Sequence, residues 1–476
     1  MKKNRNISKK TLFLYFNIPL ILVLLFRVNY NDTWFLLNHG RYILNNGFPS
    51  IEPFTIHNNF SFIMQQWLSS VIFYLSYSIL GKYGLLLITL IVTGYIIFIS
   101  YKLCMLLSDN RSKLSILISV ITVTLLATFF ITSRPHIFTF AIIITELYLL
   151  EKYIKENNTK YLYFLPILSL LEINLHASMF FMLFLFLLPY LIDAFKYKIG
   201  PFESNGYKKK PLFIVSIIML LTGLINPYGI LAITYIFRSY GVNSINSVVS
   251  EMAPLVINDL VGKICLVIIF SIIFIYIFYR KNNFKTRYFL LLIGGILPLA
   301  YYLKPAFRKD DIKDKEKSYK YILNSCLLGI IGFLIIISTN SFVFTYKYKE
   351  GIDYLLDNNK PSDITLYTGF NEGAYPEWMG IKCYIDPRAE VFLKKNNLKE
   401  DIMEEYYLLQ IGKIDVSSFL EKYKFSYLLV PETDYLYDNM SDVDNYKIVY
   451  NNISINEFSV DTYNEKIKYK IYKRIS

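Results

Sequence analysis

Long apolar runs alternate with short polar loops along most of this chain. A membrane-spanning helix needs about 20 mostly apolar residues to cross roughly 30 Å of hydrocarbon. On this criterion the pattern predicts a mainly α, polytopic membrane domain over residues 1–346 with about nine to eleven spans. The predicted spans are 11–28, 82–104, 114–132, 137–154, 161–171, 177–194, 212–225, 262–279, 288–303 and 321–345.

The loops between these runs are of two kinds. One kind is rich in lysine and arginine, and the other kind holds almost no lysine. Because cytoplasmic loops carry an excess of Lys and Arg, we expect the basic loops inside and the others outside. The outer loops would be 29–66, 133–136, 172–176 and 226–260, and together they contain all four histidines, His39, His57, His136 and His176. The basic loops have the pattern of a solvated face, so we expect any chemistry on the outer side.

The segment 161–195 is too short for two complete spans, which need about 40 residues before a turn is counted. Its middle is polar at Glu172, Asn174 and His176. We therefore expect the turn to lie below the outer membrane surface, where polar backbone needs protein or a water-filled cavity beside it. Ionisable residues at that depth indicate a functional site, and a hydrogen-bonded turn that only joins two helices is the alternative.

The apolar runs stop near residue 347, and residues 347–476 predict a small soluble α/β domain. The expected strands are 364–367, 382–385, 427–430 and 468–472, and the expected helices are 398–409 and 416–423. Gly294, Gly295 and Pro298 interrupt the apolar segment 288–303, and the loop 304–319 has nearly balanced charge. The side of the membrane that this domain occupies therefore stays open.

Composition agrees with a membrane protein, since 54% of the residues are hydrophobic and only 18% are charged. The net charge of +13 comes from lysines between apolar runs, so the positive-inside rule accounts for it and we exclude nucleic-acid binding. The four cysteines are scattered without metal spacing, which predicts neither a disulfide framework nor a zinc site. The basic residues 1–10 are followed by a long apolar run without a small-residue cleavage site, which predicts a retained first helix.

Asp32 follows the first apolar run directly. Aspartate is a good N-cap, and Thr33–Asn46 has the pattern of a helix on the membrane surface, with Gly47 at its C-terminal end and Pro49 just beyond. On these grounds alone Asp32 is either a cap or a functional acid.

This layout resembles the first outer loop of GT-C superfamily glycosyltransferases, which include protein O-mannosyltransferases and the aminoarabinose transferases of lipid A. The shared order is a span, an acid, an amphipathic helix, a glycine, a short extended loop, a polar-aromatic cluster and a second amphipathic helix. The resemblance implies an active-site acid at Asp32 and a surface helix, rather than a span, at 68–80. The family's acid and lysine align with Gln65 and Gln66, ahead of Trp67.

A set of motifs in order resembles uncharacterised bacterial members of this superfamily more specifically. The motifs are Asp32 to Ile43, Arg134 to Phe138, Asn174 to His176, Asn226 to Gly229, Glu251 to Pro254, and Asp386 to Glu390 with Gly373 and Tyr375 ahead of it. The chain departs from the superfamily at three places: Asn31 precedes Asp32 where many members have a second acid, Gln65-Gln66 replaces an acid and a lysine, and Met252 follows Glu251 in place of Trp.

The resemblance implies a GT-C-like membrane domain and a transferase that uses a sugar carried on a polyprenyl phosphate. Asp32 would be the base that takes a proton from the acceptor hydroxyl. Cationic or imidazole groups would stabilise the leaving phosphate. The candidates for binding are His39, Arg41, Gln65, Gln66, Trp67, Arg134, His136, Asn174, His176, Arg238 and Glu251, and the C-terminal candidates are Asp386, Arg388 and Glu390.

Each of these candidates also has an ordinary interpretation. An outer-face arginine can extend to lipid phosphate, a tryptophan can anchor at the interface, and Asp386 with Arg388 can form an internal ion pair. No cofactor is indicated and a divalent metal stays open. The expected partners are membrane lipid, the lipid-linked donor and a glycan, lipid or protein acceptor, with the active side and the C-terminal domain outside the cell membrane. The rival interpretation is a non-catalytic transporter or assembly partner for lipid-linked glycans.

Overall fold

The computed structural model describes residues 32–239, 241–249, 256–258, 260–279, 284–307, 309, 330–338, 346–441, 443–455 and 466–475. The described residues form two compact units. The helical unit comprises those within 83–233 and 256–338, and the sheet unit comprises those within 32–82, 234–249 and 346–475. The predicted span 11–28 and most of the predicted span 321–345 lie outside the described residues.

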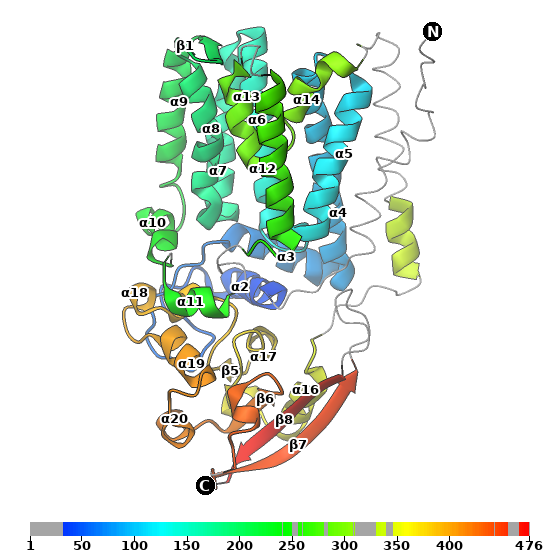
Figure 1. The fold of residues 1–476 in the computed structure, drawn as a ribbon. Coiled ribbons are helices and arrows are strands. Elements are labelled where there is room, and N and C mark those ends of the chain that lie inside the picture. The colour runs from blue at the N-terminus through cyan, green and yellow to red at the C-terminus, as the bar shows by residue number, and fades with distance from the viewer. Residues whose placement is uncertain are drawn as a thin grey trace. The chain divides into compact units, whose positions relative to one another are not determined.

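The helical unit is a bundle whose longer helices run side by side (Figure 1). Its small sheet has the order β1-β2-β3, with β1 and β2 antiparallel and β2 and β3 parallel. Its helices are α4 (Lys82–Leu107), α5 (Ser112–Phe129), α6 (His136–Glu156), α7 (Leu165–Leu175), α8 (Phe180–Asp193), α9 (Lys209–Thr222), α12 (Leu260–Tyr279), α13 (Thr286–Gly294) and α14 (Leu299–Tyr302), and its strands are β1 (Lys196–Ile199), β2 (Phe202–Asn205) and β3 (Phe284–Lys285). Helix α10 (Ile230–Ser239) continues from this unit into the other.

Two breaks in this bundle are those that the sequence predicts. Helix α7 ends at Leu175, a short 3-10 turn Ala177–Met179 follows, and α8 then begins. Helix α13 ends at Gly294, where the backbone becomes extended at Gly295, and Pro298 precedes the next helix. The interruptions of segments 161–195 and 288–303 are therefore confirmed.

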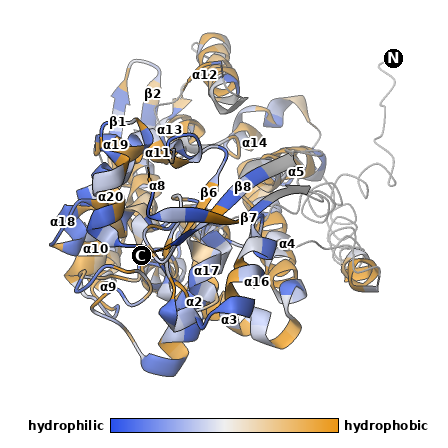
Figure 2. Cartoon of the chain, turned by 90° about the horizontal axis from the view of Figure 1, so that it is seen from below, coloured by the Kyte–Doolittle hydropathy of each residue, from blue (hydrophilic) through white to orange (hydrophobic). Residues whose placement is uncertain are grey.

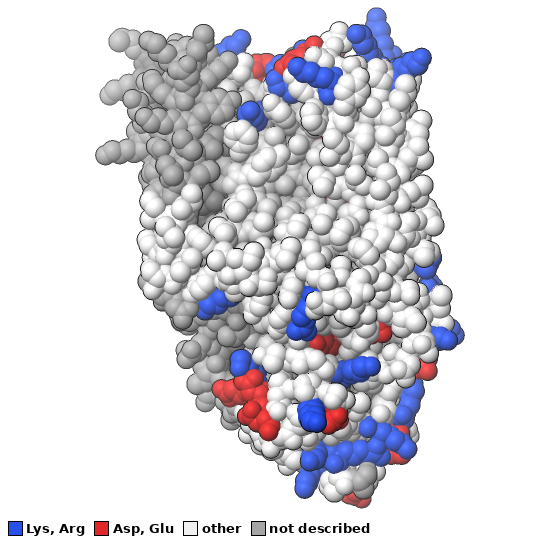
Figure 3. All heavy atoms as spheres, turned by 180° about the vertical axis from the view of Figure 1, so that it is seen from behind, with Lys and Arg blue, Asp and Glu red and all other residues white. Residues whose placement is uncertain are grey.

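The outer surface of the bundle is apolar. Ile214, Ile217 and Leu221 on α9 are exposed, as are Phe270 and Phe274 on α12. Figure 2 shows largely hydrophobic colouring on α12, and Figure 3 shows a broad band without charged side chains on the face of the bundle that it draws. Among the described residues one helix, Lys82–Leu107, is both long and apolar enough to cross a membrane, and several apolar helices are shorter. The number of spans stays a prediction.

A buried ion network lies at the basic-loop end of the bundle. The guanidinium of Arg287 contacts Oε1 of Glu151 at 3.1 Å and Oδ2 of Asp193 at 2.5 Å, and the Tyr288 hydroxyl donates to Glu151 at 2.9 Å. The expectation that the basic loops are purely solvated faces is wrong for Arg287, because two carboxylates from α6 and α8 draw it into the interior.

The sheet unit is built around a five-stranded sheet of order β5-β4-β6-β8-β7. Strand β4 pairs in parallel with β5 and β6, and the β6, β8 and β7 pairs are antiparallel. The strands are β4 (Thr365–Tyr367), β5 (Lys382–Cys383), β6 (Tyr427–Pro431), β7 (Tyr446–Ile455) and β8 (Lys466–Arg474). The helices are α2 (Asp32–Asn46), α3 (Trp67–Leu80), α11 (Asn243–Val248), α16 (Lys349–Asn358), α17 (Ala374–Trp378), α18 (Lys394–Asn397), α19 (Ile402–Gln410) and α20 (Val416–Tyr423).

The packing of the sheet unit differs from the division expected at residue 347. Residues 32–82, which we grouped with the membrane domain, pack with the C-terminal residues instead. The expected strands and helices of 347–476 are present, with shorter bounds at β5 and α19. The sequence pattern revealed neither β7 nor α16. Strand β7 was missed because it lies at a sheet edge and carries three asparagine or serine residues among its apolar ones.

Candidate active site

Helix α2, which begins with Asp32, is held by aromatic and cationic contacts. The Trp34 ring lies 4.8 Å from the Tyr375 ring and 6.2 Å from the Trp378 ring, centroid to centroid. The Arg41 guanidinium stacks 3.9 Å above the Trp378 ring and donates to the Trp378 carbonyl at 2.6 Å. Both contacts join α2 to α17, so the C-terminal residues fix the helix that carries Asp32.

Helix α2 also lies very close to α3. A Cβ on Gly40 would lie 2.3 Å from the Ser70 carbonyl oxygen, so only glycine fits at this crossing. At its far end α2 terminates at Asn46, and Gly47 follows with a φ of 80°. The helix and its glycine stop are those that the sequence predicts.

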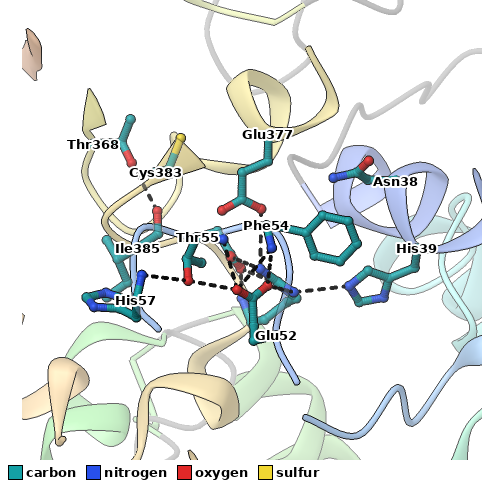
Figure 4. Close-up of polar contacts among 12 residues, drawn as sticks. Asn38, His39, Glu52, Phe54, Thr55, His57, Thr368, Glu377, Cys383 and Ile385 are labelled. Atoms are coloured by element: carbon teal, nitrogen blue, oxygen red, sulfur yellow. Dashed lines mark hydrogen bonds and ion pairs between the residues drawn. The ribbon is translucent and has the colours of Figure 1, made fainter. Parts of the chain in front are cut away.

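Arg388 is the centre of a buried polar cluster, much of which Figure 4 shows. Its guanidinium contacts Oε1 of Glu52 at 3.0 Å and Oε2 of Glu377 at 3.3 Å. It also forms a two-pronged ion pair with Asp386, in which Nε donates to Oδ1 at 2.8 Å and Nη2 donates to Oδ2. Nη1 lies 3.2 Å from Nε2 of His39. The internal ion pair expected for Asp386 and Arg388 is present, in a turn after β5 rather than on a strand.

Glu52 holds the loop after α2 in shape. Its carboxylate accepts the backbone N–H of Phe54 at 3.0 Å, and it accepts the N–H of Thr55 at 2.8 Å and the Thr55 hydroxyl at 2.7 Å. Further along, His57 donates Nε2–H to the Tyr384 carbonyl at 2.7 Å. One carboxylate thus orders its own loop and binds Arg388, which attaches that loop to the C-terminal residues.

This cluster holds three carboxyl groups, those of Glu52, Glu377 and Asp386, but only one guanidinium. Burial and the nearby Asp386 carboxylate raise the pKa of Glu377 well above its usual value, against the opposing effect of Arg388. The repulsion between Glu377 and Asp386 is relieved when one of the two carboxyl groups binds a proton. We place that proton on Glu377, and the remaining carboxylates hold the pKa of Arg388 well above its usual value although burial alone would lower it.

His39 is neutral in this setting. Burial, with a smaller effect of Arg388, lowers its pKa well below the usual value. Its ring also lies 5.4 Å from the Phe54 ring and 5.5 Å from the Phe62 ring. Through these contacts His39 packs the buried side of α2 against Phe54 and Phe62.

Asp32 lies in the first turn of α2 and is partly exposed, in contrast to the Arg388 cluster. Its charge acts on Glu390, whose pKa is raised by burial first and then by Asp32. Tyr235 is buried in the same neighbourhood, within the electrostatic reach of Glu390 and Arg238. Asp32 therefore acts on Glu390, and Glu390 and Arg238 both act on Tyr235.

The polar-aromatic cluster lies at the start of α3. Gln65 is buried, and its Oε1 has no hydrogen-bond partner among the described residues. Gln66 precedes the helix and accepts the Ser70 N–H through its backbone carbonyl at 2.9 Å. The Trp67 ring packs edge-on against the Phe48 ring at 5.1 Å. Trp67 thus has a packing partner, and the orphaned amide oxygen of Gln65 is the group that a sugar hydroxyl could satisfy.

The remaining candidates lie in the helical unit. The His136 and His176 rings are 4.5 Å apart, and the charge of Arg134 acts on His176. Asn174 donates to the carbonyls of Leu170 at 2.8 Å and Ile225 at 3.0 Å, which ties α7 to the chain after α9. Glu251 lies outside the described residues.

Sequence reasoning missed Glu52, Glu377 and Thr139, and it had already singled out Glu172 in the polar turn of 161–195. Glu52 and Glu377 belong to the Arg388 cluster, and Thr139 and Glu172 lie in a buried network of the helical unit. A carboxylate between aromatic residues in a loop with few charges was an available signal for Glu52. Nothing in the sequence indicates which cation Glu377 would meet.

The donor set does not favour a metal. The described residues contain no group of three or more His, Cys, Asp or Glu side chains that could hold a metal ion. The carboxyl groups of Glu52, Glu377 and Asp386 converge, but the Arg388 guanidinium occupies the place between them. We therefore route no step through a metal.

No protein-family model matches this chain, and no curated protein matches it. Among solved structures it is similar to the archaeal oligosaccharyltransferase AglB from Archaeoglobus fulgidus, in complex with an inhibitory peptide and a dolichol-phosphate. The TM-score is 0.52 at 11% sequence identity, over 88% of this chain and 69% of that one. The chain has a GT-C-like glycosyltransferase fold. At this identity the likeness shows the fold alone, and it confirms neither of the two families to which the first outer loop is similar.

Proposed function

We propose that this protein is a glycosyltransferase that moves a sugar from a polyprenyl-phosphate-linked donor to an envelope acceptor at the outer membrane face. The fold supports the proposal, because AglB shares it and was solved with a dolichol-phosphate and a peptide. The observation that carries the proposal is the place of Asp32. It is an acid on the first turn of a helix that the C-terminal residues fix. Its charge acts on Glu390, and Glu390 and Arg238 both act on the buried Tyr235.

Asp32 is the general base in this proposal. Its carboxylate takes the proton of the acceptor hydroxyl while the acceptor oxygen bonds to the anomeric carbon of the sugar. The bond from that carbon to the carrier phosphate breaks, and its electron pair leaves on the phosphate oxygen. Arg238, in the same unit, would stabilise the negative charge on the leaving phosphate. Glu390 keeps a second carboxyl group beside the base.

The internal ion pair also supports an outer location for the C-terminal residues. Glu52 lies in a loop expected outside, and Arg388 binds it at 3.0 Å within one compact unit. Two segments that share a buried ion pair lie on the same side of a membrane. If the loop after α2 is outside, the C-terminal sheet is outside with it. We therefore propose an outer location for the domain whose membrane side the loop charges left open.

The membrane assignment rests on the bundle surface. Exposed apolar side chains on α9 and α12 would be costly in water and are favourable against lipid chains. We therefore propose that the helical unit is embedded in the membrane and that its buried ion network around Arg287 faces the cytoplasmic end.

The test compares lipid-linked sugars by mass spectrometry in cells with the wild-type chain, a deletion or Asp32→Asn. Asparagine caps a helix about as well as aspartate, so this variant removes the carboxylate and keeps the cap. Asp401→Asn is the matched control, because Asp401 caps α19 through a bond to the Glu404 N–H at 3.0 Å. We expect one lipid-linked species to accumulate in the deletion and in Asp32→Asn but not in Asp401→Asn. Accumulation in the deletion alone would contradict a catalytic Asp32 and favour a transporter or assembly partner.

A further inference from the structure

A connected row of polar side chains lies inside the helical unit and shares no residue with the site described in the sheet unit. The Thr139 hydroxyl of α6 lies 2.6 Å from Oε1 of Glu172 on α7 and 2.9 Å from Nδ1 of His176. All three residues are buried, and Glu172 has no exposed surface. The His136 ring stands 4.5 Å from the His176 ring at the other end of the row.

The Glu172 carboxyl group carries a proton. Its Oε1 has the Thr139 hydroxyl as partner, and its Oε2 has no hydrogen-bond partner among the described residues. An ionised carboxylate with a single hydroxyl partner in an apolar interior costs several kcal/mol, so the group keeps its proton.

The single hydroxyl between them links the acid to the imidazole. A threonine hydroxyl has one proton to donate and lone pairs to accept with. When Glu172 donates to Thr139, Thr139 donates to Nδ1 of His176, and the ring carries its own proton on Nε2. When both hydrogen bonds reverse, Nδ1 holds the proton and Nε2 is an acceptor. A proton can therefore pass between Nε2 and Glu172 without a charged imidazole.

The charges that face His176 indicate what meets Nε2. Arg134 and His136 are the basic groups that act on it, and the acid Glu172 contacts the Thr139 hydroxyl that also contacts Nδ1 of His176. Arginine and an imidazole N–H are donors that suit a phosphate oxygen. We propose that Glu172, Thr139 and His176 form a proton relay that ends at Nε2 of His176 and serves a phosphate group bound beside Arg134.

The relay balances its protons. The Nε2–H proton moves to a phosphate oxygen, the Thr139 proton moves to Nδ1, and the Glu172 proton moves to Thr139. The phosphate gains one proton, Glu172 becomes a carboxylate, the hydroxyl ends unchanged, and the imidazole stays neutral but ends as the Nδ1–H tautomer. Reversal of the three transfers restores the acid.

The experiment uses the full chain in lipid nanodiscs, labelled with 15N in histidine. NMR reports the tautomer of His176, with a His176→Gln sample to assign its signal, and titration measures the affinity for farnesyl phosphate and for inorganic phosphate. Thr139→Val removes the hydroxyl and keeps the shape, Thr139→Ser restores the hydroxyl, and Thr93→Val is the matched control. Thr93 is equally buried, and its hydroxyl donates to the Thr89 carbonyl of its own helix at 2.7 Å.

We expect the Nε2–H tautomer in the wild-type chain and in Thr139→Ser. Thr139→Val should lose that preference and bind the phosphate probe about tenfold more weakly, in line with the loss of one hydrogen bond in a chain that ends on a charged group. Thr93→Val should match the wild-type chain in both measurements. Tighter binding of farnesyl phosphate than of inorganic phosphate would support a lipid headgroup as the source, and equal binding would support a free phosphate.

Three results would overturn the relay: an Nδ1–H tautomer in the wild-type chain, an unchanged tautomer and affinity in Thr139→Val, or no binding of either probe. None of these measurements depends on sugar transfer. A failed relay therefore leaves the proposal for Asp32 standing, and the reverse also holds.

Discussion

The Arg388 guanidinium lies 3.0 Å from the Glu52 carboxylate, so a residue in the turn after β5 binds the loop that follows α2. The same guanidinium contacts His39, which is two helical turns beyond Asp32 on α2. Arg388 therefore supports the position of Asp32 from below, and we regard it as a positioning residue rather than a catalytic one.

Removal of Arg388 should cost far more stability than replacement of the Glu377 carboxyl group by an amide. Arg388→Leu leaves the Glu52 and Asp386 carboxylates buried without their cation, and we expect a loss of about 3–5 kcal/mol. Glu377→Gln keeps the shape of a carboxyl group that is already protonated, so the loss should be below about 1 kcal/mol. Denaturant unfolding of both variants in one detergent measures the contrast, and equal losses would contradict the protonated Glu377.

A second acid of the sheet unit makes stability depend on pH. Burial and the charge of Asp434 raise the pKa of Glu372 to about 7 from its usual 4.5. The folded state therefore binds this proton more tightly, so its contribution is complete below about pH 4.5 and is lost as pH rises through about 7. Relative to Glu372→Gln, the wild-type chain should lose at most about 3 kcal/mol over that window. A difference that stays flat with pH would contradict this assignment.

The close approach of α2 and α3 predicts opposite effects of alanine at two helical glycines. Gly40→Ala places a Cβ 2.3 Å from the Ser70 carbonyl, so we expect a loss of about 1–3 kcal/mol and a lower transfer rate through displacement of Asp32. Gly94→Ala in α4 meets nothing within 4 Å and should be neutral or stabilising. Thermal unfolding of the two variants separates them, and a neutral Gly40→Ala would show that the helices can move apart freely.

Glu390 should set the pH range over which Asp32 works. Each carboxylate raises the cost of ionising the other, as the effect of Asp32 on the pKa of Glu390 indicates. Glu390→Gln removes a negative charge beside Asp32, so the base form should persist to lower pH. We expect the acid limb of the rate–pH profile to move to lower pH. A limb that stays in place while the rate falls would indicate that Glu390 contacts the acceptor instead.

Periodicity predicted much of the fold, because helix length and breaks follow from local chemistry. Gly47 after α2, the polar turn at Glu172 to His176, and Gly294 with Pro298 mark real ends of helices. The GT-C-like fold that the ordered motifs implied is confirmed by the likeness to AglB. Strand β7 was missed because an edge strand need not alternate strictly.

The site could be predicted less completely, because its contacts join distant parts of the chain. Asp386 and Arg388 are near neighbours in sequence, and their ion pair was expected. That Glu52 and Glu377 share the same guanidinium depends on tertiary packing, which no local pattern carries. The catalytic role of Asp32 and the binding roles of Arg134, His136 and Arg238 stay predictions.

The decisive assay uses the purified chain with the lipid-linked sugar that accumulates in the deletion, and it follows release of free polyprenyl phosphate over time. With Asp32 as the base, Asp32→Asn should slow release by about 100-fold or more, since general base catalysis contributes about that much. The Asp401→Asn chain should release the carrier at the wild-type rate. Release by Asp32→Asn at the wild-type rate would contradict the account and leave Asp32 as a helix cap.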